Sequence, residues 1–103
     1  MALKKPKIMR PVHAGVTLME DFLKPMGMSP NRLALELRVP ATRVGDIVRG
    51  RRAITADTSL RLSRYFGTSA QFWMNLQVNF DLEVAVDKIG SEIQEVIRPH
   101  RAA

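Results

Sequence analysis

Arginine side chains are the residues in this sequence best suited to bind a ligand, and they are concentrated in one segment. Residues 38–64 contain seven arginines but only two acidic residues, Asp46 and Asp57, which gives this segment a net charge of +5. A guanidinium group can donate two parallel hydrogen bonds to a phosphate, or to O6 and N7 of a guanine. Charge concentrated in this way favours a polyanionic partner such as a nucleic acid, and solvated surface charge is the alternative.

The remaining composition narrows the class of protein. The chain of 103 residues carries a net charge of +6, and residues 1–10 contribute +4 through three lysines and one arginine. We therefore predict a flexible basic arm over residues 1–12. There is no cysteine, which excludes disulfides and thiolate metal sites and suits a reducing compartment. No apolar run approaches the ~20 residues that span a bilayer, and the start lacks the apolar core of a signal peptide, so we expect a soluble, cytoplasmic protein.

The spacing of apolar residues is helical throughout, and no segment alternates as a strand does. Ser29 is a good N-cap and precedes Pro30 at the first helical position. Pro25 is expected to end the first helix, and Gly50 and Gly67 to end later ones. Helices are predicted over residues 15–24, 30–37, 41–49, 56–66 and 70–80, with a further helix from Leu82 to near Pro99. The fold class is therefore all-α, a compact domain of five or six helices over residues 13–80, followed by a C-terminal helix and tail over residues 81–103.

A helix-turn-helix is predicted with its centre at residues 34–49; in this motif two short helices cross steeply around a turn of three or four residues. Ala34 permits the close crossing, and an apolar underside is supplied by Val39, Val44 and Ile47. A plain helical hairpin is the structural alternative. In a helix-turn-helix the N-terminal part of the second helix enters the major groove of DNA. The predicted base-reading residues are Ala41, Thr42, Arg43 and Asp46, where Asp46 either accepts a hydrogen bond from cytosine or orients Arg43 or Arg49.

A second set of polar residues surrounds this motif and suits contacts to phosphates, which position a protein without reading sequence. The predicted phosphate-binding residues are Ser29, Asn31, Arg49, Arg51, Arg52, Arg61 and Arg64. Arg38 stands at the turn position that usually prefers glycine, and a left-handed backbone there would cost about 1 kcal/mol.

Other residues suit packing or association better than catalysis. No Ser-His-Asp set, metal-ligand cluster or phosphate-cradling glycine loop is present, so we predict no enzyme activity, no metal and no cofactor. Leu60 is expected in the core, and Trp73 either in the core or at a dimer seam. The C-terminal helix carries a heptad-like apolar stripe whose partner is the domain core, a second subunit or another protein. The residues of that stripe are Leu82, Val86, Ile89, Ile93 and Val96.

From about residue 13 to residue 82 the chain resembles the HigA-type, or VapI-like, antitoxins of bacterial toxin–antitoxin pairs. The stretches RRAITADT (51–58) and YFGTSAQFW (65–73) carry the resemblance. The chain departs from the family at Arg38, where glycine is usual, and at residues 13–16, which read His-Ala-Gly-Val in place of His-Pro-Gly-Glu. The resemblance implies a lambda-repressor-like fold and a homodimeric repressor that binds an inverted-repeat operator in double-stranded DNA.

The same resemblance implies a protein partner, a small basic ribonuclease toxin similar to HigB that cleaves mRNA. Two alternatives remain open at this point. One is a stand-alone transcriptional regulator without a toxin, and the other is a protein-interaction antitoxin whose DNA binding is vestigial.

Overall fold

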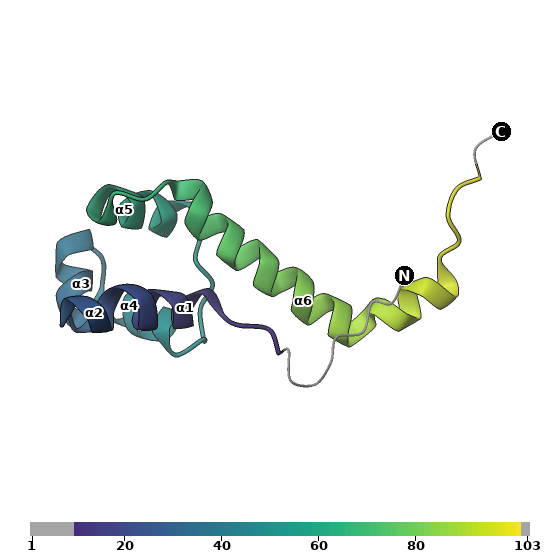
Figure 1. Cartoon of the computed structure of the whole chain (residues 1–103), viewed down its shortest axis with the longest axis horizontal. Helices are drawn as coiled ribbons and strands as arrows, with labels where there is room; N and C mark the ends of the chain where they lie inside the picture. The colour runs from purple at the N-terminus through teal and green to yellow at the C-terminus, as the bar shows by residue number, and fades with distance from the viewer. Residues whose placement is uncertain (1–9, 102–103) are drawn as a thin grey trace.

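The computed structural model describes residues 10–101, and all regular elements within them are helical (Figure 1). The elements in chain order are α1 (Ala14–Thr17), η1 (Leu18–Leu23), α2 (Lys24–Met26), α3 (Pro30–Leu37), α4 (Ala41–Val48), α5 (Ala56–Phe66) and α6 (Ala70–Val96). The predicted all-α class is confirmed. Most of the predicted basic arm, residues 1–12, lies outside the described residues. Among the helices of the described part, none is both long enough and apolar enough to cross a bilayer.

The first three elements run on without a break as one helix whose middle, η1, is a π-helix. The prediction that Pro25 ends this helix is wrong, because the helix passes through Pro25 and ends at Gly27, which adopts a φ of 63°. A proline in an α-helix collides with the carbonyl four residues earlier. Here that carbonyl belongs to Asp21, inside the wider π-helical turn, where Lys24 N–H donates to Met19 O five residues back. The π-helix therefore accommodates the ring.

In the described part of the chain, one cluster of buried apolar side chains forms the core. Its members are Ala14, Leu18, Leu23, Leu33, Ala34, Leu37, Val44, Ile47, Ile54, Leu62 and Trp73. Trp73 is fully buried, and its ring centroid lies 4.9 Å from that of Phe22 and 6.1 Å from that of Phe66. The indole Nε1 donates a hydrogen bond of 2.6 Å to Thr68 Oγ1, which satisfies its polar atom. Aromatic packing therefore joins the first helix to α5 and α6.

Two features of this packing differ from a generic amphipathic arrangement. A Cβ built on Gly15 would lie 1.8 Å from the carbonyl oxygen of Ile47, so α1 crosses the end of α4 at a distance that only glycine allows. On α5 the buried residues are Thr58, Ser59 and Leu62, which lie on the face opposite Leu60. The prediction that Leu60 faces the core is therefore wrong, and its side chain is 63% exposed.

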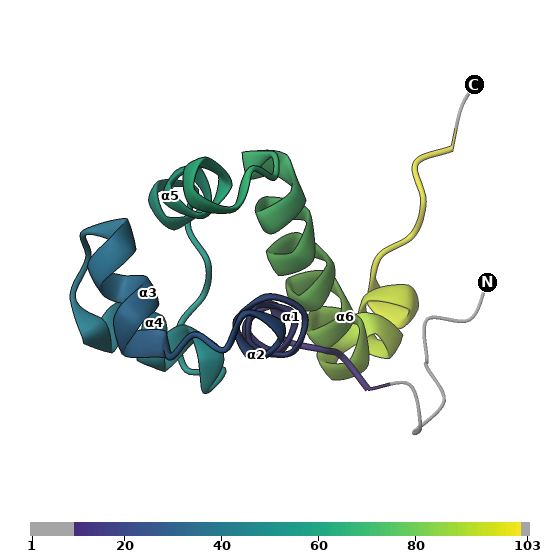
Figure 2. The same ribbon diagram turned by 60° about the vertical axis from the view of Figure 1, so that its left-hand side comes forward.

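α6 is a single helix of 27 residues that begins at the N-cap Ser69, whose Oγ accepts from Phe72 N–H at 3.0 Å. The prediction of a separate helix that starts at Leu82 is wrong, because no glycine or proline interrupts the backbone there. Gln77 Nε2 and Asp81 Oδ1, one turn apart, also form a hydrogen bond of 2.9 Å along the helix. The first half of α6 packs on α1 and α5, and the second half extends away from the other helices (Figures 1 and 2).

Candidate nucleic-acid interface

α3, α4 and the turn between them have the predicted helix-turn-helix geometry. Ser29 Oγ caps α3 by accepting from Arg32 N–H at 3.1 Å. Arg38 ends α3 in the left-handed conformation, with φ 60° and ψ 45°, as its position in the turn predicts. The next residue, Val39, donates its N–H to Ala34 O at 3.1 Å, which closes the helix end. Hydrogen bonds on both sides of Arg38 therefore hold it in a backbone conformation that is unfavourable for a side chain.

Five of the predicted site residues line one hollow formed by the N-terminus of α3 and the outer face of α4. They are the predicted base readers Ala41 and Thr42 and the predicted phosphate-binding residues Ser29, Asn31 and Arg49. Pro30, Gly45 and Val48 complete the lining. The hollow lies at the N-terminus of α3, where the helix dipole suits an anion, although Pro30 has no N–H and Arg32 N–H already donates to Ser29 Oγ. Residues predicted to read bases and residues predicted to bind phosphate therefore lie on the same surface.

Gly45 is a site residue that the sequence reasoning missed. It lies in the middle of α4, and a Cβ built on it would meet only the Arg49 side chain, with Nη1 at 3.1 Å. The guanidinium group of Arg49 therefore lies back along its own helix, over the space that the glycine leaves. A glycine inside a short helix costs about 1 kcal/mol relative to alanine, and this cost was the signal available in the sequence.

Arg43 does not line the hollow and points instead toward α5. Its Nη1 lies 2.8 Å from Oδ1 of Asp57, and Nε of Arg61 lies 2.8 Å from the same oxygen. The hydrogen bond from Arg61 is the main cause that holds the pKa of the Asp57 carboxyl below its usual range; desolvation opposes it, and the hydrogen bond from Arg43 and the charges of both arginines lower the pKa further. Asp57 therefore stays ionised between two arginines. The carboxylate that contacts Arg43 here is that of Asp57, and the role predicted for Asp46 stays a prediction.

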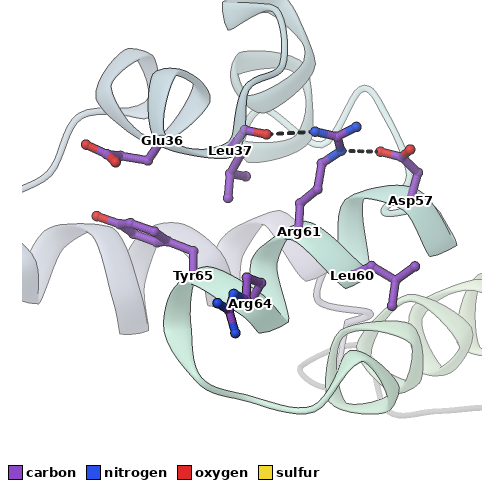
Figure 3. A pocket seen from close by; sticks show the side chains of 7 residues that line it. All are labelled: Glu36, Leu37, Asp57, Leu60, Arg61, Arg64 and Tyr65. Atoms are coloured by element: carbon purple, nitrogen blue, oxygen red, sulfur yellow. Dashed lines mark hydrogen bonds and ion pairs between the residues drawn. The ribbon is translucent and has the colours of Figure 1, made fainter.

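Arg61 is held by contacts within the chain on both sides (Figure 3). Besides its contact with Asp57, it donates from Nη1 to the Leu37 carbonyl oxygen at 2.9 Å, at the C-terminus of α3. Arg61 and Arg64 line a second hollow, between α3 and α5, together with Glu36, Leu37, Asp57, Leu60 and Tyr65. The structure thus separates these two arginines from the hollow that Ser29, Asn31 and Arg49 line.

Arg51 and Arg52 lie exposed in the loop that follows α4. The loop is folded against the end of that helix, because Arg51 N–H donates to Asp46 O at 2.8 Å and Gly50 N–H to Ile47 O at 3.0 Å. Gly50 has a φ of 74°, as expected for the residue that follows a helix C-terminus. Both arginines are therefore accessible to a partner.

Comparisons with known proteins agree with this geometry. A helix-turn-helix family model matches residues 19–73. Over 74 residues the chain is 53% identical to virulence-associated protein I of Dichelobacter nodosus, which covers 72% of this chain and 68% of that protein. The structure of the Pseudomonas aeruginosa antitoxin HigA with the higBA promoter matches with a TM-score of 0.86 at 49% identity, covering 87% of this chain and 98% of that one. The chain belongs to the HigA-type antitoxin family. Antitoxin GraA in complex with its operator is also similar, with a TM-score of 0.87 at 42% identity, over 98% of this chain and 100% of that one.

In this HigA-type fold Trp73 belongs to the core, and the alternative that it lies at a dimer seam is wrong because its side chain is fully buried. The apolar stripe of α6 is different. Leu82, Ile89 and Ile93 are exposed and Val86 is half-buried, so most of the stripe does not pack on its own core.

His13 joins three parts of the HigA-type domain. Its Nδ1 accepts from Gly15 N–H at 2.9 Å and so caps α1, and its ring packs edge-on against Phe80 of α6 with centroids 4.9 Å apart. Its ring atoms also lie near Gly50, where a Cβ would be 3.8 Å away. Burial lowers the pKa of His13 below 6.5, and the charge of Asp81 offsets part of that effect. The neutral imidazole is therefore the form that fits this position.

Proposed function

We propose that this chain is an antitoxin-type repressor that binds operator DNA through the hollow between α3 and α4. The observation that carries the proposal is the grouping of Thr42 and Ala41 with Ser29, Asn31 and Arg49 on one surface. Hydroxyl and methyl groups at the start of α4 suit base edges in the major groove, and the N-terminus of α3 suits a phosphate. Two structural relatives, the HigA and GraA antitoxins, have been solved with their promoter or operator DNA, which supports the same role here.

The test is DNA binding measured by fluorescence anisotropy. The probes are a duplex from the region upstream of the chain's own gene and a scrambled duplex of the same base composition. We expect preference for the first duplex and an affinity that falls steeply with salt, because each neutralised phosphate contributes about 0.9 to the slope of log K against log salt. Equal binding to both duplexes, or a flat dependence on salt, contradicts the proposal.

Two arginine variants separate base reading from phosphate binding. Arg43→Ala is expected to cost about 1–3 kcal/mol on the upstream duplex and to relax preference at one base position. Arg52→Ala serves as the matched control and is expected to weaken both duplexes alike. If Arg43→Ala leaves the ratio of the two affinities unchanged, Arg43 is not a base reader.

The proposed repressor acts as a homodimer that uses the exposed stripe of α6. Val78, at 45% exposure, extends the stripe toward the core, and Val96, its last member, is 67% exposed. A continuous apolar face on a helix that extends from the domain suits a partner helix of the same kind. A two-fold dimer also supplies the second reading head that an inverted-repeat operator requires.

Truncation of one stripe residue tests the dimer. Leu82→Ala removes ~1.5–3 kcal/mol of apolar burial per subunit, or twice that in a symmetric dimer, and should raise the dimer dissociation constant by about a hundredfold or more. Leu60→Ala is the matched control, since Leu60 is 63% exposed and Leu82 59%, but Leu60 lies on α5. Sedimentation equilibrium measures both variants. A Leu82→Ala protein that associates as tightly as the Leu60→Ala protein contradicts the proposed seam.

The proposed partner in the cell is a small basic ribonuclease toxin similar to HigB, which the antitoxin neutralises. Family membership is the main support. Residues 81–96 add five acidic side chains against one basic residue, Lys88, which suits a basic partner. Co-expression with the neighbouring reading frame should relieve growth arrest caused by that frame. If the neighbouring frame is not toxic, the stand-alone regulator is the correct function.

A further inference from the structure

The ion pair between Arg43 and Asp57 connects the helix proposed to enter the groove with the helix that follows the loop. Arg43 is in the first turn of α4 and Asp57 in the first turn of α5. The Arg43 side chain is only 28% exposed, whereas that of Asp57 is 57% exposed. The pair therefore lies at the edge of the molecular surface, with its arginine partly enclosed.

The position of the Asp57 carboxylate is determined by a third residue. Arg61 contacts it at 2.8 Å and is itself fixed at 2.9 Å on the Leu37 carbonyl, where α3 ends. The chain of contacts from Leu37 through Arg61 and Asp57 thus ties Arg43 to the turn of the helix-turn-helix. The N-terminus of α5 also favours a carboxylate in its first turn, which keeps Asp57 ionised.

A single hydrogen bond to Asp57 leaves Arg43 with donors to spare. A guanidinium group has five N–H donors in a rigid planar fork, and the contact with Asp57 engages only Nη1. An arginine fixed at one corner of the fork loses little further side-chain freedom when the remaining donors meet a base. The negative charge of the Asp57 carboxylate also repels a phosphate, and this disfavours a contact between Arg43 and the phosphate.

We propose that Asp57 is a specificity-determining residue, which positions Arg43 to read a guanine and prevents it from binding phosphate at any sequence. The proposal rests on the DNA-binding function above and assigns a role to a residue outside the helix-turn-helix. Asp57 acts through Arg43 and does not itself contact the base. The competing arrangement is one in which Asp57 withholds Arg43 from DNA altogether.

The test compares Asp57→Asn with Asp87→Asn, a control that makes the same change of charge at an exposed position on α6. Both are measured on the upstream and scrambled duplexes over a range of salt concentrations, and in wild-type and Arg43→Ala backgrounds. Thermal unfolding followed by circular dichroism confirms that each variant folds. For Asp57→Asn we expect the ratio of the two affinities to fall by about tenfold or more, which is the discrimination one good arginine–guanine pair supplies. We also expect the salt slope on the scrambled duplex to steepen by about 0.9, because Arg43 gains a phosphate contact.

The Arg43→Ala background distinguishes positioning from a general structural effect. There, Asp57→Asn should cause no further loss of discrimination, because the residue it positions is already absent. A ratio unchanged by Asp57→Asn overturns the proposal, as does an equal loss of discrimination in both backgrounds. Tighter binding to the upstream duplex with its preference retained also overturns it and shows that Asp57 withholds Arg43. If the wild-type chain shows no preference between the duplexes, the proposed function fails instead, and the two failures are distinct.

Discussion

Replacement of Gly15 and of Gly45 by alanine, one at a time, should change the stability of the fold in opposite directions. Each alanine favours its helix by about 0.5–1 kcal/mol at an interior position, and by less at Gly15 in the first turn. At Gly45 the new Cβ would meet only Arg49 Nη1 at 3.1 Å, the end of a flexible side chain that can move aside. We therefore expect Gly45→Ala to raise the free energy of unfolding by about 0.5–1 kcal/mol.

At Gly15 the same methyl group meets backbone that cannot move alone. It would lie 1.8 Å from the Ile47 carbonyl oxygen and 2.7 Å from its carbonyl carbon, so α1 and α4 must separate by more than 1 Å to restore an ordinary contact. Overpacking of this kind costs about 1–3 kcal/mol, which exceeds the gain in helix propensity. The melting temperature should fall by about 4–8 °C for each kcal/mol lost in a domain of this size.

Urea unfolding followed by circular dichroism measures both variants under identical conditions. A Gly15→Ala protein as stable as the wild type would refute the close crossing of α1 and α4. A Gly45→Ala protein that is stabilised and binds the upstream duplex more weakly is the expected result, since the methyl group displaces Arg49. Stabilisation with unchanged DNA binding would show that the space left by Gly45 is not needed for Arg49 to bind DNA.

Three further predictions concern stability. Above about pH 7, His13 is neutral in both the folded and the unfolded chain and should not affect the free energy of unfolding. As the pH drops below 6.5 toward the lowered pKa of the folded state, the free energy of unfolding should fall, because the unfolded chain binds the proton more readily than the folded chain does. His13→Asn retains a cap acceptor and should reduce that pH dependence. Arg38→Gly should raise the free energy of unfolding by up to about 1 kcal/mol, since φ is 60° there, and an unchanged urea midpoint would contradict the strain. Gln77→Ala should cost about 1–3 kcal/mol, because Ile54 N–H loses its buried acceptor at 2.8 Å, whereas the exposed Gln71→Ala should cost almost nothing.

The helix boundaries that depend on local chemistry could be predicted from the sequence. Ser29 and Ser69 cap their helices as expected, and Gly50 follows a helix end with positive φ, because each effect acts within a few residues. The end at Pro25 could not be predicted correctly, because the π-helix that admits the ring has no local sequence signature. No break precedes the helix predicted from Leu82, because the residues before it continue the same helix without a proline or glycine.

The grouping of the candidate site residues could be predicted only in part. Ala41 and Thr42 are expected together at the start of the second helix of the motif, because a helix-turn-helix has a fixed internal geometry, and both line the hollow on α4. The partner of Arg43 lies 14 residues away, on another helix, and Leu37, one of the two partners of Arg61, lies 24 residues away. Contacts between helices depend on how the helices pack, so the sequence pattern could not identify Asp57 as the residue between these two arginines.

The continuity of α6 has a consequence for the kind of operator that the proposed dimer can use. Its 27 residues form a rod of about 40 Å that carries a buried Trp73 near one end and the exposed stripe toward the other. The helix is continuous between the proposed DNA-binding unit and the proposed seam. One additional base pair between half-sites turns one of them by roughly 35° about the DNA axis, and a rigid rod cannot follow that rotation by bending a linker. The helix would then act as a geometric ruler, and the permitted spacing of the operator would be set by the fold of the protein and not by the bases it reads.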